Sequence, residues 1–146
     1  MKVIFLDIDG VLNTPNTWGK RPFGEALERP LVERASQLVK DTDADVVISS
    51  TWGKIHSIGA IIGWLAAKGF EPTNRIVDVT PDLENRAREI EAWLFKRPNV
   101  TAWVALDDDT AADGSLGHLE CWVPINDRVG LTDANVESAK HFLTRG

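Results

Sequence analysis

Short apolar runs rich in β-branched residues recur along the chain and alternate with longer segments in which apolar positions return every three or four residues. The runs predict strands at residues 3–6, 45–48, 75–79, 102–106 and 121–125. Strands separated by helices favour parallel pairing with right-handed crossovers. The expected fold class is therefore α/β: a three-layer, Rossmann-like parallel sheet of about five strands with helices on both faces.

The longer segments predict four amphipathic helices, each with one apolar face toward the sheet. The expected inward residues are Leu31, Val32, Ala35, Leu38 and Val39; Ile55, Ile58, Ile61, Ile62 and Leu65; Leu83, Ala87, Ile90, Trp93 and Leu94; and Val136, Ala139, Phe142 and Leu143. The third helix is expected to begin at Thr80, a capping residue followed by Pro81. Asp82 and Glu84 would then lie at the positive end of its dipole.

Length and composition indicate a single domain over residues 1–146 with no internal repeat or linker. The net charge of −6 argues against binding a polyanion through bulk charge. The lone Cys121 cannot form an internal disulfide, and the first apolar run is too short for a signal peptide or a membrane span. We therefore expect a cytoplasmic protein without a membrane partner. Nothing in the pattern indicates an oligomeric state.

Acidic and hydroxyl side chains follow three of the predicted strands. They are Asp7 and Asp9 after the first strand, Ser49 and Ser50 after the second, and Asp107 and Asp108 after the fourth. The carboxyl ends of parallel strands share one edge of a sheet, and neighbouring strands lie about 4.8 Å apart, so these groups can surround one small volume. Carboxylates that close repel one another unless a hard cation such as Mg²⁺ lies between them. Gly10 would let the backbone turn away.

Each of these pieces also has an ordinary structural interpretation, because Asp-rich strand ends occur as turn and capping signals. An EF-hand loop is excluded, since Gly10 follows Asp9 directly and the required ligand spacing is absent. Three polar strand ends in one chain nevertheless favour a functional site over three unrelated turns.

At these positions the sequence resembles the haloacid dehalogenase-like (HAD) phosphohydrolase superfamily. Its first motif, an apolar strand followed by Asp-x-Asp-Gly, is matched by residues 3–12. Its second, an apolar strand ending in Ser or Thr, is matched by residues 46–49, and its fourth, a strand ending in paired acids, by residues 103–108. The third motif is a Lys or Arg on the preceding helix, for which Arg86 is the first candidate and Arg88 the second.

The resemblance spans nearly the whole chain. Within the superfamily, residues 48–52, 86–94 and 130–132 are similar to a small capless group associated with nucleic-acid repair phosphatases. The intervals between the motifs also leave no room for an inserted cap domain.

The resemblance implies a Mg²⁺-dependent phosphatase. Asp7 would be the nucleophile that forms an aspartyl-phosphate, and Asp9 would act first as general acid and then as general base. The metal would be held by Asp7, the backbone carbonyl of Asp9, and Asp107 or Asp108. The Asp at position 9 is typical of the members that act on phosphate esters, and not of the P-type ATPases or phosphonatases.

The resemblance also implies a phosphate-binding set. Ser49, or Ser50 in its place, would hydrogen-bond a phosphoryl oxygen. Arg86, or Arg88, would neutralise the charge on the phosphate, although Lys is the commoner residue there. Backbone amides of the turn at Gly10 would add further donors.

Aromatic and cationic residues follow the first two motifs. Trp18 and Arg21 follow the first, and Trp52 and Lys54 follow the second, so both pairs can flank the mouth of the site. Aromatic rings beside cations suit a nucleobase with its phosphate, which favours a nucleotide or a nucleic-acid terminal phosphate as substrate. Alternatively, Trp18 packs the loop and Trp52 covers the sheet edge.

Other functions stay open at this stage. The substrate of a phosphatase with this pattern can equally be a phosphoprotein or a small metabolite. A non-catalytic phosphate- or Mg²⁺-binding module could keep the fold, although the complete Asp7 and Asp9 pair argues against it. A receiver-like domain would ordinarily carry its phosphorylated Asp on a middle strand, whereas Asp7 follows the first.

Overall fold

The computed structural model describes residues 1–83, 85–108 and 115–144. Glu84 and Asp109, the latter directly after the acidic pair at the fourth strand end, lie outside the described residues. The described part contains a parallel sheet of five strands in the order β3-β2-β1-β4-β5. The strands are Lys2–Leu6 (β1), Asp45–Ile48 (β2), Ile76–Val79 (β3), Ala102–Asp107 (β4) and Trp122–Pro124 (β5). The expected α/β class is thus confirmed.

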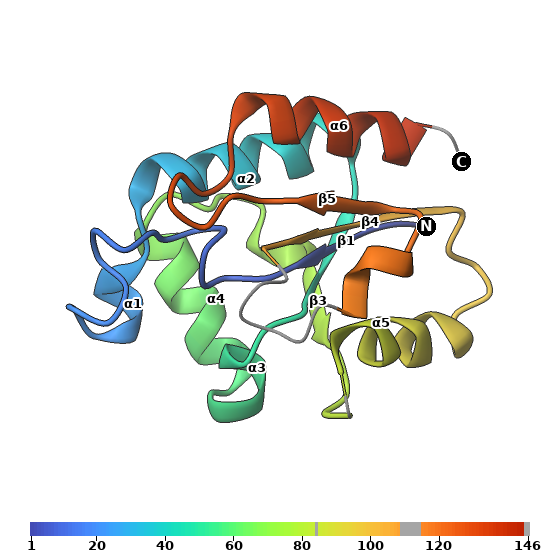
Figure 1. Cartoon of the computed structure of the whole chain (residues 1–146), viewed down its shortest axis with the longest axis horizontal. Coiled ribbons are helices and arrows are strands. Elements are labelled where there is room, and N and C mark those ends of the chain that lie inside the picture. Colours follow the sequence, from blue (N-terminus) through green and yellow to red (C-terminus); the bar gives the residue numbers. More distant parts are fainter. Residues whose placement is uncertain (84, 109–114, 145–146) are drawn as a thin grey trace.

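Helices cover both faces of this sheet (Figure 1). They are α1 (Phe23–Ala26), α2 (Arg29–Thr42), α3 (Trp52–Ile55), α4 (Ile58–Ala67), α5 (Arg86–Phe95) and α6 (Asp133–Thr144), with short 3₁₀ turns η1 (Thr73–Arg75) and η2 (Ser115–His118). Within the described residues there is no cap domain, as expected, and no helix has the length and apolar character needed to cross a bilayer.

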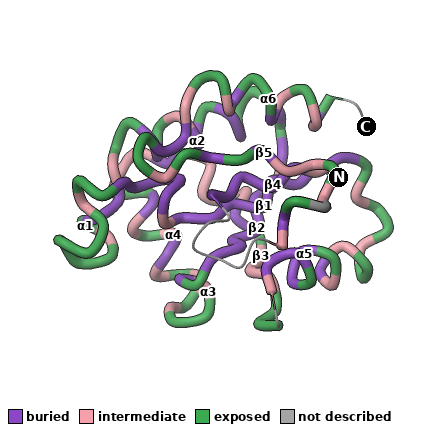
Figure 2. The backbone as a smooth tube through the Cα atoms, in the orientation of Figure 1, coloured by how far each residue is buried: buried purple, intermediate pink, exposed green. Residues whose placement is uncertain are grey.

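Alternation along β1 divides the core into two layers. Ile4 and Leu6 pack into the larger cluster beneath α2, α4 and α6, whereas Val3 and Phe5 pack against α5 on the opposite face. The central strands are buried on both faces (Figure 2). Burial on both sides explains why their sequences are continuous apolar runs.

The second predicted helix is interrupted. Its positions divide between α3 and α4 because Ser57 is extended and caps α4, where its hydroxyl accepts the backbone N–H of Ala60 at 3.2 Å. Ile55 ends α3 and is 65% exposed, so its expected burial is wrong.

The third predicted helix begins later than expected. Thr80 does not cap it: its backbone N–H donates to the Ile48 carbonyl at 3.0 Å, which continues the pairing of β2 with β3. The cap is Asn85, whose side chain accepts the Arg88 backbone N–H at 2.9 Å. Leu83 therefore lies outside the helix and is 44% exposed, against its expected place in the core.

Candidate active site

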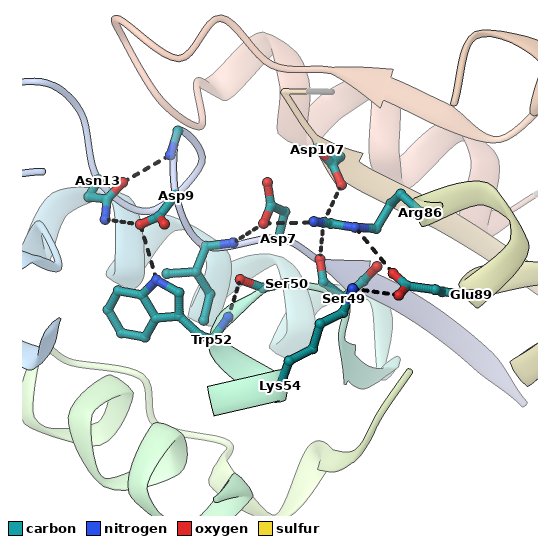
Figure 3. A network of polar contacts seen from close by, with 12 residues as sticks. Asp7, Asp9, Asn13, Ser49, Ser50, Trp52, Lys54, Arg86, Glu89 and Asp107 are labelled. Atoms are coloured by element: carbon teal, nitrogen blue, oxygen red, sulfur yellow. Dashed lines mark hydrogen bonds and ion pairs between the residues drawn. The ribbon is translucent and has the colours of Figure 1, made fainter. Parts of the chain in front are cut away.

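The sheet brings the three polar strand ends together (Figure 3). Beyond the last paired residues, the backbone N–H of Asp7 donates to the Leu106 carbonyl at 3.0 Å, and the N–H of Ser49 donates to the Leu6 carbonyl at 2.9 Å. Both residues are therefore fixed to neighbouring strands, and Asp107 is the last residue of β4 beside them. Because β1 lies between β2 and β4, its carboxyl end is the centre of this edge.

Three buried carboxylates form the core of the site. Asp7, Asp107 and Asp108 each offer an oxygen atom, and these atoms lie within 4.8 Å of one another. Burial raises the pKa of Asp7 well above its ordinary value, with repulsion from Asp107 adding to the rise. Burial and Asp107 also raise the pKa of Asp108 to about 7. Asp108 Oδ2 is buried with no hydrogen-bond partner among the described residues. This donor set fits a hard divalent cation such as Mg²⁺.

Arg86 lies directly against this cluster. Its buried guanidinium contacts Asp107 Oδ2 at 2.8 Å and Asp7 Oδ1 at 3.3 Å through Nη1, which also donates to the Ser49 carbonyl. Arg88, two residues later on α5, is exposed. Of the two candidates for the phosphate-neutralising cation, the geometry thus places Arg86 at the site.

Glu89 forms an ion pair with Arg86 through the guanidinium Nε. The sequence did not single out this residue. Its carboxylate is almost fully buried, 3.6 Å from Arg86 Nε and 2.6 Å from Lys54 Nζ. Lys54 therefore turns to Glu89 and to Asp82, at 3.3 Å, rather than standing free at the mouth as the sequence suggested. The only sequence signal was the spacing of Glu89 three residues after Arg86, on one helix face.

The two serines of the second strand end differ in their surroundings. Ser49 Oγ is buried and has no hydrogen-bond partner among the described residues. A buried hydroxyl ordinarily finds a partner, so this one is suited to a ligand oxygen. Ser50 Oγ instead accepts the backbone N–H of Trp52 at 3.2 Å, which fixes the start of α3.

Gly10 gives the acidic cluster its space. Its φ is +82°, and a Cβ atom there would lie 2.3 Å from Asp108 Oδ2 and 2.9 Å from the Cβ of Asp127, a residue the sequence did not single out. Its amide donates to the Asn13 side-chain oxygen at 2.9 Å. The Gly10 amide therefore already donates within the turn, and phosphate binding by the backbone amides of this turn stays a prediction.

Asp9 is held by two side chains from different parts of the chain. Its Oδ1 accepts Asn13 Nδ2–H at 2.9 Å and Trp52 Nε1–H at 3.1 Å. Trp52 is only 2% exposed, and its ring centroid is 5.0 Å from that of Phe23 and 5.8 Å from that of Trp64. The expected use of Trp52 as an open stacking face for a base is wrong, because the ring is buried in contact with Phe23 and Trp64.

Comparison with known families agrees with this geometry. The family model described as "HAD domain in Swiss Army Knife RNA repair proteins" matches residues 3–136. The chain belongs to this family. No curated protein and no solved structure matched in the two other comparisons. The matched range of this HAD domain includes every strand-end residue described above, and it confirms the superfamily resemblance and its link to nucleic-acid repair.

A cleft of about 270 Å³ opens at Asp9 of the HAD domain. It is lined by Asp9, Asn13, Trp18, Gly19, Arg21, Pro22, Phe23, Ala26 and Trp52. Trp18 is 37% exposed there, which leaves part of its ring available to a ligand. The cleft thus joins the Asp9 carboxylate to an aromatic and cationic rim.

Proposed function

We propose that this HAD domain hydrolyses phosphate monoesters through an aspartyl-phosphate on Asp7, with Mg²⁺ as cofactor. The observation that carries the proposal is the meeting of the Asp7, Asp107 and Asp108 carboxylates within 4.8 Å, against the Arg86 guanidinium. A lone acidic cluster can be structural, but here it adjoins a permanent cation, Arg86, and the Ser49 hydroxyl, which has no hydrogen-bond partner in the described part of the chain. Family membership supports a phosphatase-type function in RNA repair.

The proposed reaction has two displacements at phosphorus. A carboxylate oxygen of Asp7 forms a bond to phosphorus as the ester P–O bond breaks, and the leaving oxygen takes a proton from Asp9. Water then attacks phosphorus and gives its proton to Asp9, while the bond from Asp7 to phosphorus breaks and inorganic phosphate is released. Asp7 and Asp9 both return to their starting states, so one residue pair completes the cycle.

The surrounding groups stabilise charge during these steps. Arg86, which contacts Asp7, would offset the negative charge on the transferring phosphoryl group, and the Ser49 hydroxyl would donate to one of its oxygens. Asp7, the Asp9 backbone carbonyl, and Asp107 or Asp108 would hold Mg²⁺. When bound, Mg²⁺ would reduce the repulsion between the nucleophile and the phosphate.

The proposal is tested by assaying the purified chain with para-nitrophenyl phosphate and Mg²⁺, and by acid-quenching the reaction to trap the phosphorylated intermediate. We expect release of nitrophenol and a hydroxylamine-sensitive phosphoryl group on the peptide that contains Asp7. A chain that binds phosphate but never turns over the ester would support the alternative of a non-catalytic module.

We further propose that the substrate is a nucleotide or a nucleic-acid terminal phosphate. The cleft adjoins Asp9, the proposed proton donor to the leaving oxygen, so the leaving group would enter it. Trp18 and Phe23 offer apolar aromatic surface to a base, and Arg21 offers a cation to a second phosphate. The family description, which refers to RNA repair, points to the same substrate class.

Trp18→Ala is expected to raise the KM for 3′- or 5′-phosphorylated oligonucleotides about tenfold, because stacking on one aromatic ring contributes about 1–3 kcal/mol per base. The KM for para-nitrophenyl phosphate should change less than about twofold. Phe95→Ala is the matched control, since Phe95 is 90% exposed and does not line the cleft. Equal effects of Trp18→Ala on both substrates would rule out stacking, and faster turnover of phosphopeptides or small phosphate esters would redirect the substrate class.

Mg²⁺ should stabilise the fold more at pH 8 than at pH 5.5. The pKa of Asp108 is about 7 in the fold, against an ordinary pKa of 3.8. The folded state therefore holds a proton that the unfolded state has lost, and without metal its stability falls as the pH rises from 3.8 to about 7. Mg²⁺ offsets the repulsion between Asp108 and Asp107 only where the Asp108 carboxyl is ionised. The increase in Tm on adding Mg²⁺ should therefore grow with pH, to a few degrees at pH 8. Thermal unfolding with and without MgCl₂ measures it. Asp108→Asn should flatten the pH dependence; an equal Mg²⁺ effect at both pH values would contradict the metal assignment.

A further inference from the structure

Among the described residues, the Asp9 side chain accepts hydrogen bonds on one of its two oxygens only. The described hydrogen bonds to its side chain, from Asn13 Nδ2–H at 2.9 Å and Trp52 Nε1–H at 3.1 Å, both end on Oδ1. Asn13 lies in the turn after β1, whereas Trp52 begins α3 after β2. Two segments that are distant in sequence therefore meet at one carboxylate oxygen (Figure 3).

The orientation of both donors is fixed. The Asn13 side-chain oxygen accepts the Gly10 backbone N–H at 2.9 Å, so the NH₂ group of its amide must face Asp9. The indole N–H of Trp52 can only donate. Both residues are buried, and the Trp52 ring is held by Phe23 and Trp64, so neither donor can follow Asp9 if that side chain rotates.

We propose that Asn13 and Trp52 are positioning residues that reserve Oδ2 of Asp9 for proton transfer. An oxygen that faces two N–H groups cannot also carry a hydrogen without placing like partial charges together. A partial rotation of the carboxyl would leave two buried donors unpaired, and a half-turn would bring the protonated oxygen to face the same two N–H groups. In the steps above, the proton thus leaves Oδ2 for the leaving oxygen as the ester bond breaks, and water later returns a proton to the same atom. This inference rests on the proposed function.

The indole N–H is separable from the packing of the ring. A phenylalanine at position 52 would keep most of the apolar contact with Phe23 and Trp64 but would donate nothing to Asp9. We call the two N–H donors of Asn13 and Trp52 the clamp. If the clamp acts by directing the proton of Asp9, its loss should slow most the esters whose leaving group must be protonated as it departs. Nitrophenolate is a weak base and departs without protonation, whereas phenolate, of nearly the same shape, gains from it.

The experiment compares Trp52→Phe with the unaltered chain on phenyl phosphate and para-nitrophenyl phosphate, with saturating Mg²⁺. The readout is kcat/KM, which covers only the steps up to release of the first product. We expect the value for phenyl phosphate to fall about tenfold or more, and that for the nitrophenyl ester less than about twofold. Trp93→Phe is the control: Trp93 is also buried, and its N–H donates to Asp78 Oδ2 at 2.9 Å, on the α5 side of the sheet.

Each outcome decides the proposal. Equal losses on both esters would make Trp52 a purely structural residue, and unchanged values on both would make its N–H irrelevant; either result overturns the clamp. Should Trp52→Phe fail to fold, Asn13→Ala removes the other donor and must show the same dependence on the leaving group. An unaltered chain that turns over neither ester would instead overturn the proposed function, and the role of the clamp with it.

Discussion

Asp7→Asn is expected to abolish ester hydrolysis while the chain remains folded. The amide is nearly isosteric with the carboxylate but does not form an acyl phosphate, so kcat should fall by at least about 10⁴-fold, as for other enzymes that lose their nucleophile. The Asn side chain keeps an oxygen that can accept the Ile8 backbone N–H, which Asp7 Oδ1 accepts at 2.8 Å. The local turn therefore has no reason to change, and the assay with para-nitrophenyl phosphate reports on chemistry alone.

The same substitution should not lower the Tm measured without metal, and should raise it near pH 8. Burial and the carboxylates of Asp107 and Asp108 raise the pKa of Asp7, so the ionised form is disfavoured in the fold. A neutral amide removes one repelling charge. Asp43→Asn is the matched control, because Asp43 has a left-handed backbone conformation that Asn also tolerates. This variant should retain full turnover. Undiminished turnover in Asp7→Asn would place the nucleophile elsewhere.

The positions of the strands were predictable because a strand that is buried on both faces must be a short run of apolar residues. β2 coincides with its predicted bounds, since a short apolar run between Asp45 and Ser49 is what a strand covered on both faces requires. The ends of helices were less accessible. The spacing of Ile55 and Ile58 fits one continuous helix, but the extended backbone of His56 and Ser57 separates α3 from α4. The Thr80-Pro81 pair is typical of a helix start, but the backbone N–H of Thr80 donates to the Ile48 carbonyl and so belongs to the sheet.

The candidate site divides in the same way. Asp7, Ser49 and Asp107 could be expected at one sheet edge, because parallel topology alone brings the carboxyl ends of neighbouring strands together. The contact between Trp52 and Asp9 could not, since it depends on how α3 leaves the sheet and on the turn after β1. A hydrogen bond between residues that are 43 positions apart leaves no periodic pattern in the sequence from which it could be predicted.

Arg86→Met is expected to cause the largest loss of stability of any single substitution at the site. The guanidinium is buried and lies within 3.3 Å of Asp7 and 2.8 Å of Asp107. Removing it leaves these buried carboxylates without their cation, which typically costs about 3–5 kcal/mol of the free energy of unfolding. Urea unfolding at pH 7 measures the loss. Turnover should vanish as well, because the charge that offsets the phosphoryl oxygens is gone.

Two further variants separate charge from bulk. Arg86→Lys retains a cation but has a single nitrogen, whereas Arg86 contacts Glu89 through Nε and both Asp7 and Asp107 through Nη1, so both stability and turnover should be intermediate. Arg88→Met removes the same side chain from an exposed position on the same helix, and should change the free energy of unfolding by less than about 1 kcal/mol with turnover intact. If Arg88→Met instead lost turnover while Arg86→Met kept it, the phosphate-neutralising cation would be Arg88, and the buried guanidinium would serve the fold alone.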